Sequence, residues 1–141
     1  MGYSASGAVA GEARPAGQQP PGIVGLAGML TLSWLISPTG QAIVTFAGEL
    51  DAASADQAYR YVRAAIDAHG GPVLLDVAGL SFCDAGGLGA FARMSRHAAQ
   101  TGSSVRLVAP PPLLRKIIRI TGLADQLPVH RGDQAGHAQV A

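Results

Sequence analysis

The sequence predicts a mixed α/β domain, in which helices pack on a mixed sheet of four to five strands. Three stretches carry apolar residues at helical spacing, and short apolar runs of strand character separate them. Near the start, a turn rich in Pro and Gly joins two further runs, which is typical of a hairpin. The predicted element order is therefore β-β-α-β-α-β-α-β, and its alternation after the hairpin favours parallel neighbours in the sheet.

The hairpin comes first. Apolar residues occupy every second position from 30 to 36, the turn Pro38-Thr39-Gly40 follows, and residues 42–47 form the second predicted strand. Residues 52–69 then carry an amphipathic helical stripe that ends at Gly70-Gly71. The nearly continuous apolar run 73–77 suits a buried central strand.

The second half repeats this alternation. A second helical stripe follows Asp84 and ends near Gly102, and residues 105–108 form the next predicted strand. The prolines at 110–112 interrupt the chain before a third helical stripe, and a short last strand is expected over residues 127–130.

Both ends of the chain lack periodicity. Residues 1–28 contain seven Gly, three Pro and six Ala, so we expect a disordered leader there, and a disordered tail over residues 131–141. The domain itself is predicted over residues 29–130. The apolar stretch 23–36 contains Thr and Ser and is too short to span a membrane, and no basic segment precedes it as in a signal peptide. We therefore expect no membrane association.

Composition disfavours several functional classes. The net charge of +1 gives no overall electrostatic attraction to nucleic acid, so we expect no direct nucleic-acid binding. The single cysteine precludes an internal disulfide, so we expect a cytoplasmic protein. The four histidines have no metal-ligand spacing, and neither a nucleophile elbow nor a phosphate-binding loop is present. The expectation is a protein with no metal, no cofactor and no enzymatic activity. We expect a monomer or a weak dimer.

The segment from Gly79 to Gly89 carries the strongest functional signal. Asp84 is an expected helix N-cap, because its carboxylate can accept from the free N–H groups of the first turn. Three glycines within that turn need another reason, since each costs about 1 kcal/mol relative to Ala in a helix. Close packing, an anion at the helix N-terminus or a partner lying flat on the turn would each require a bare backbone. Phe82 and Cys83 are expected in the core.

Three pieces of the sequence resemble the STAS domains of bacterial anti-sigma factor antagonists. They are Gly48-Glu49-Leu50-Asp51, the stretch from Asp76 through Asp84 to Gly89, and the stretch from Val105 to Leu123 with its proline-led helix and Thr-Gly-Leu end. The resemblance extends from the hairpin to His130 and implies the STAS fold. It also implies a binding switch, in which the domain binds an anti-sigma factor of the serine kinase type and so releases a sigma factor.

In that family the kinase phosphorylates a hydroxyl directly after the aspartate, and the complex breaks. The family pattern reads Asp-Ser-Ser-Gly-Leu-Gly or Asp-Ser-Thr-Gly-Leu-Gly, whereas Ala85 and Gly86 occupy the two hydroxyl positions here. Neither residue can accept a phosphoryl group. The alternatives are an antagonist that no kinase turns off, which we favour, a domain regulated in another way, and a partner that is not a kinase. Ser81 and Ser95 are the nearest hydroxyls and are weak substitutes.

The predicted partner surface combines the loop before the first helix with the turn that begins the second. Asp51 is also expected to cap the first helix. The surface consists of Glu49, Asp51, Asp84, Ala85, Gly86, Gly87, Leu88 and Gly89. Two alternative functions are an accessory STAS subunit that regulates a transporter or a larger signalling assembly, and, less favoured, a small-ligand sensor. Basic residues off the helical stripes also predict positive faces on the second and third helices.

Overall fold

In the part of the chain that the structure describes, five strands form one mixed sheet whose order follows the chain, β1-β2-β3-β4-β5. The computed structural model describes residues 23–25 and 29–130. The strands are β1 (Ile23–Gly25), β2 (Leu30–Ile36), β3 (Ala42–Leu50), β4 (Val73–Cys83) and β5 (Val105–Val108). The pairs β1/β2 and β2/β3 are antiparallel, whereas β3/β4 and β4/β5 are parallel. The predicted fold class, an α/β domain with a mixed sheet, is confirmed.

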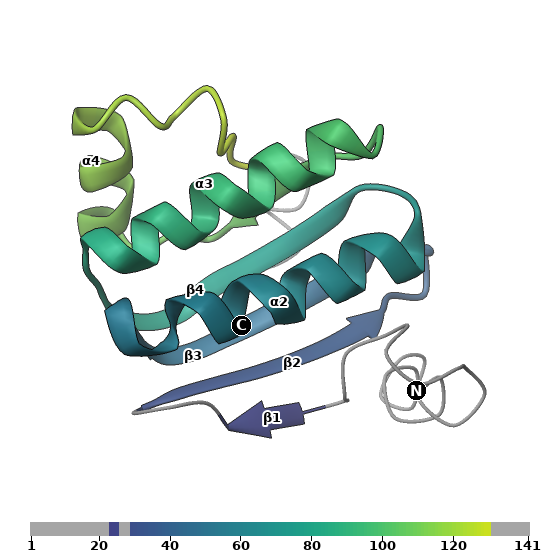
Figure 1. Cartoon of the computed structure of the whole chain (residues 1–141), viewed down its shortest axis with the longest axis horizontal. Coiled ribbons are helices and arrows are strands. Elements are labelled where there is room, and N and C mark those ends of the chain that lie inside the picture. The colour runs from purple at the N-terminus through teal and green to yellow at the C-terminus, as the bar shows by residue number, and fades with distance from the viewer. Residues whose placement is uncertain (1–22, 26–28, 131–141) are drawn as a thin grey trace.

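Helices supply both parallel crossovers. α2 (Ala52–His69) connects β3 to β4, and α3 (Ala85–Gln100) connects β4 to β5. The two helices run side by side over one face of the sheet, as Figure 1 shows. Their apolar stripes cover the inward side chains of the strands, and the rings of Phe46 on β3 and Phe91 on α3 lie 5.5 Å apart in the centre of this core.

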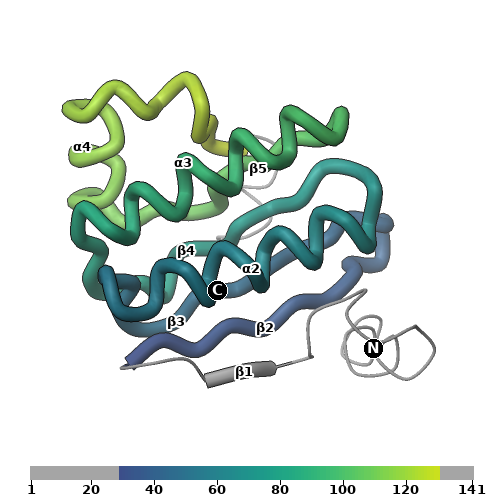
Figure 2. The backbone as a smooth tube through the Cα atoms, in the orientation of Figure 1, coloured from purple at the N-terminus to yellow at the C-terminus, as the bar shows by residue number. Residues whose placement is uncertain are grey.

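The last helix, α4 (Pro112–Ile120), stands at the end of the molecule where α3 begins (Figure 2). It starts with Pro112, which lacks a backbone N–H; in the first turn of a helix this N–H would have no partner within the helix, so no hydrogen bond is lost. Leu114 and Ile118 are buried and attach the helix to the core.

β3 and β4 extend further than the sequence predicted. Ala78-Gly79 interrupts the apolar run, but the pairing with β3 continues past it through a register shift. At this irregularity the N–H of Ala78 donates to Asp76 Oδ1 at 3.1 Å. A Cβ at Gly79 would lie 2.9 Å from the carbonyl oxygen of Phe46, so the two strands can approach each other only with glycine there. The extension carries β4 directly to Asp84.

The closing strand predicted over residues 127–130 is wrong. Val129 forms a single parallel bridge to Leu107, in which the Leu107 N–H donates to the Pro128 carbonyl and the His130 N–H donates to the Leu107 carbonyl. Pro128 has no N–H of its own to donate, so it cannot contribute to a longer ladder.

A different segment supplies the fifth strand. β1 pairs with β2 in the register Ile23–Ser33, and it lies inside the segment 1–28 that was predicted as a disordered leader. For these three residues the prediction is corrected. The other residues of that segment up to 22 and from 26 to 28, and the predicted tail 131–141, lie outside the described residues.

Candidate contact surface

The two helices that cover the sheet begin next to each other, at the edge where the parallel strands β3 and β4 end. Asp51 follows β3 and precedes α2, and Asp84 follows β4 and precedes α3. The backbone N–H of Asp84 donates to the Leu50 carbonyl at 3.3 Å. Parallel neighbours place their carboxyl ends at one edge, so residues far apart in sequence meet there.

Asp51 caps α2 as predicted. Its Oδ1 accepts from the Ser54 N–H at 3.0 Å, and the Ser54 hydroxyl oxygen accepts from the Asp51 N–H at 3.2 Å. This reciprocal pair is a capping box, and Ser54 is fully buried beneath it.

Asp84 caps α3 and also contacts α2. Its Oδ1 accepts from the Gly87 N–H at 3.0 Å, which confirms the predicted N-cap. Its Oδ2 accepts from the N–H of Ala52 at 3.2 Å. One carboxylate therefore joins the first turns of both helices. Ala52 was not predicted to take part, since its contribution is a backbone N–H that no sequence pattern marks.

Two of the three glycines are explained by this close approach. A Cβ on Gly86 would lie 2.8 Å from the Ala52 Cα, and one on Gly87 would lie 2.7 Å from the Leu50 carbonyl oxygen. Close packing against β3 and α2 is therefore the reason for a bare backbone at both positions. A Cβ on Gly89 would meet no atom within 4 Å, so packing does not account for that glycine.

The predicted contact residues divide by exposure. Glu49, Ala85 and Gly89 are exposed, whereas Asp51, Asp84 and Gly86 are half-buried. Gly87 and Leu88 are buried, and Leu88 belongs to the hydrophobic core. The part of the predicted surface that a partner can touch is thus Glu49, Asp51, Asp84, Ala85, Gly86 and Gly89, which we call the turn surface.

The two substitute hydroxyls lie outside the first turn of α3. Ser81 is exposed on β4, where its Oγ donates to the Gly48 carbonyl at 3.2 Å. Ser95 lies in the second half of α3, and its Oγ donates to the Gln126 carbonyl at 2.7 Å. Neither hydroxyl has the helix N-terminal position that Ala85 occupies.

Phe82 differs from the expectation of a core position, whereas Cys83 packs against the core as expected. Phe82 is 49% exposed, and Cys83 is half-buried. Burial, with a smaller contribution from the charge of Asp84, raises the pKa of the Cys83 thiol to about 12. The thiol is therefore protonated at neutral pH, which disfavours a nucleophilic or redox role.

Across residues 23–25 and 29–130, no group of three or more His, Cys, Asp or Glu side chains is arranged to hold a metal ion. None of the helices there combines the length and the apolar character needed to cross a membrane.

Known structures share this fold. An anti-sigma factor antagonist from Mycobacterium paratuberculosis is 20% identical with a TM-score of 0.65, over 82% of this chain and 99% of that one. SpoIIAA of Bacillus in its phosphorylated form is 21% identical with a TM-score of 0.57, over 78% of this chain and 99% of that one. The murine Slc26a9 anion transporter is 22% identical with a TM-score of 0.59, over 88% of this chain and 23% of the transporter.

These low identities establish a shared fold. No curated protein sequence matches the chain. The family model STAS_2, described as "Mlab, STAS domain", matches residues 36–129, from the end of β2 to the bridge at Val129. This match covers more than half of the chain and includes α2, α3 and α4. The chain therefore belongs to the STAS domain family.

Proposed function

We propose that this chain is an anti-sigma factor antagonist of the cytoplasm, a binding protein rather than an enzyme. Its partner would be an anti-sigma factor of the serine kinase type. The chain would bind this partner as a monomer or weak dimer, and binding would cause the anti-sigma factor to release a sigma factor. The turn surface is the proposed contact. Membership in the STAS family and the fold shared with anti-sigma factor antagonists support this assignment.

One observation carries the proposal: the first residue of α3 is exposed and uncharged. Ala85 directly follows the Asp84 cap, at the position where the family's phosphorylated hydroxyl is expected. A phosphate there would add about −1.5 to −2 charges beside a carboxylate. Alanine instead keeps the turn neutral, as it would be in an unphosphorylated antagonist.

The same residues imply that the usual off-switch is missing. Neither Ala85 nor Gly86 has a hydroxyl, and a side chain longer than hydrogen at residue 86 would collide with Ala52. In this proposal the protein stays competent to bind whenever it is present, and control acts on its amount or on its partner.

A capture experiment tests the proposal. The purified full chain serves as bait in a cytosolic extract of its source organism, bound proteins are identified by mass spectrometry, and the complex is then incubated with ATP. Capture of a kinase-fold anti-sigma factor with no phosphate on the bait is the expected result. Capture of no such protein contradicts the assignment, and phosphate on Ser81 or Ser95 contradicts the missing switch.

The second candidate is an accessory STAS subunit that regulates a transporter or a larger signalling assembly. It is favoured by the match to the murine anion transporter, which includes 88% of this chain within a much longer protein. Recovery of membrane transport components, when the capture is repeated with detergent-solubilised membranes of the same organism, would support it in place of the first.

A further inference from the structure

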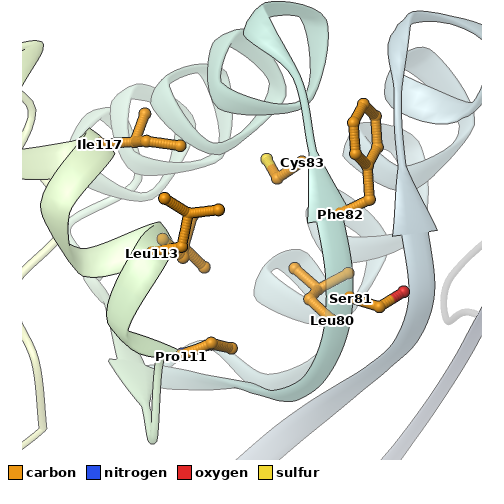
Figure 3. Close-up of a pocket in the computed structure, with 8 residues that line it drawn as sticks. Leu80, Ser81, Phe82, Cys83, Pro111, Leu113 and Ile117 are labelled. Atoms are coloured by element: carbon orange, nitrogen blue, oxygen red, sulfur yellow. The ribbon is translucent and has the colours of Figure 1, made fainter.

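An apolar groove lies between the end of β4 and α4, next to the turn surface. Figure 3 shows Leu80 and Cys83 of β4 facing Leu113 and Ile117 of α4, with Pro111 at one end. The groove has a volume of about 230 Å³. Its lining consists of Leu80, Ser81, Phe82, Cys83, Pro111, Leu113, Leu114 and Ile117.

The size and exposure of the groove fit a side chain of a protein partner. Pockets for small molecules usually measure about 300–1,000 Å³, so this one is too small to enclose a typical metabolite. Leu113 is 68% exposed at its rim, whereas the ring of Phe82 points away from the groove, to the other side of β4 (Figure 3). A large apolar side chain left open to water beside an apolar pocket is typical of a surface that binds another protein.

The charge on α4 restricts which partner fits. The helix carries Arg115, Lys116 and Arg119 and no acidic residue. Lys116 follows Leu113 by three positions and precedes Ile117, so it lies beside the groove on the helix surface. Within residues 29–130, none of these three cations has a salt bridge.

α3 provides a contrast on the same molecule. The predicted positive face there is partly neutralised, because Arg93 lies 3.3 Å from Asp56 Oδ1 and 4.0 Å from the centroid of the Tyr59 ring. On α4, Arg115 and Arg119 line a separate pocket with Ile118. The charge of Lys116 beside the groove remains available to a partner, and it favours one that carries carboxylates.

The groove also adjoins the turn surface through the backbone. Cys83 lines the groove, and Asp84 and Ala85 follow it directly. A partner segment that lies over Ala85 needs to extend only along the same edge of the molecule to reach the space between β4 and α4.

We propose that this groove binds an acidic segment of the anti-sigma factor, which inserts a large apolar side chain between Leu113 and Cys83 and directs its carboxylates toward Lys116. This inference rests on the proposed function for the identity of the partner. It adds a second anchor beside the turn surface, with specificity for an apolar residue flanked by Asp or Glu.

A designed peptide tests the groove independently of any partner. The probe is an amphipathic peptide with Leu at i, i+3, i+4 and i+7 and Glu elsewhere, and its twin carries Lys in place of Glu. The acidic peptide should shift the methyl NMR signals of Leu80, Leu113 and Ile117 saturably, whereas the basic twin should bind about tenfold or more weakly. Equal binding of both peptides, or no shift at these methyls, would overturn the inference.

Matched variants locate the contact. Leu113→Gln alters the groove, whereas Ile120→Gln alters an equally exposed apolar residue of the same helix that does not line it. Lys116→Gln is paired with Arg106→Gln, an exposed cation on β5. Leu113→Gln should weaken binding of the acidic peptide about tenfold or more, and Lys116→Gln should weaken it measurably. The control variants Ile120→Gln and Arg106→Gln should bind the peptide like the wild type. Equal effects within a pair would contradict the placement.

The captured anti-sigma factor separates the two proposals. If it binds the Leu113→Gln variant as tightly as the wild-type chain, the groove inference fails and the proposed function stands. If no anti-sigma factor is captured but the acidic peptide binds in the groove, the proposed function fails, and with it the identity of the partner, while the binding chemistry of the groove is supported.

Discussion

Oδ2 of Asp84 accepts a hydrogen bond from the backbone N–H of Ala52, 32 positions earlier in the chain, at 3.2 Å. The same carboxylate caps its own helix through Gly87. This arrangement fixes the starting points of α2 and α3 relative to each other. Glu49 and Ala85, which precede and follow the two capping residues, are consequently held on one edge of the domain.

Removing the Asp84 carboxylate should therefore destabilise the domain. Asp84→Ala loses the α3 cap and the link to Ala52, and we expect a loss of about 1–2 kcal/mol in the free energy of unfolding. Asp84→Asn keeps one side-chain oxygen for the Gly87 N–H and should lose less. Urea denaturation of both variants measures the difference. Equal stability of Asp84→Ala and wild type would show that the hydrogen bonds of Asp84 to Gly87 and Ala52 do not stabilise the domain.

The glycines of the first turn should respond in opposite directions. Gly87→Ala places a Cβ 2.7 Å from the Leu50 carbonyl oxygen, so its stability should fall by about 1–3 kcal/mol. Gly89→Ala meets open space and removes a helix-interior glycine, so its stability should rise by roughly 0.5–1 kcal/mol. Thermal melts provide the comparison, and a stabilised Gly87→Ala would contradict the packing described for residue 87.

Cys83 should react slowly with alkylating reagents in the native protein. Its pKa is raised from 9.0 to about 12, so the thiolate fraction at pH 8 falls by up to about a thousandfold relative to the unfolded chain. Because the folded state holds the proton more tightly, this thiol contributes stability that is complete below pH 9 and is lost as the pH rises toward 12. Iodoacetamide labelling with and without urea tests the difference, and similar rates would mean that the thiolate is accessible.

Restoring a hydroxyl at the first position of α3 should restore a phosphate acceptor. Ala85 is exposed, and serine fits its backbone without strain, so Ala85→Ser should remain as stable as the wild type. When this variant is incubated with the captured anti-sigma factor and ATP, the proposed kinase activity of that partner should place phosphate at residue 85. The wild-type chain is the control. Absence of phosphate on the variant would indicate that the partner is not a kinase for this turn.

Local signals were predictable from the sequence. Asp51 and Asp84 were identified as N-caps because capping depends on a few neighbouring residues, and α2 was placed correctly by its apolar spacing and the glycines after it. The end of β4 was missed, because Ala78-Gly79 looks like the end of a strand, although the chain continues through a bulge against Phe46.

The geometry of the site could be described only once the three-dimensional fold was known. That Gly86 packs against Ala52 depends on how two helices meet, and nothing in either local segment encodes that distance. Phe82 is apolar and was expected in the core, yet it is half exposed because a second register shift, between Gly48 and Glu49, pairs it with the exposed Glu49 and not with a core residue. The groove with α4 likewise arises only when β4 and α4 are placed together.

The most direct test of the account is the affinity of the captured anti-sigma factor for three forms of the chain: wild type, Ala85→Asp and Ala99→Asp. Ala99 is exposed on the same helix, about 21 Å along its axis from Ala85, so the control adds an identical charge away from the turn surface. The proposed contact at a neutral turn predicts that Ala85→Asp binds about tenfold or more weakly, with an unchanged thermal midpoint, while Ala99→Asp binds like the wild type. Equal binding of all three forms would show that the start of α3 is not the interface.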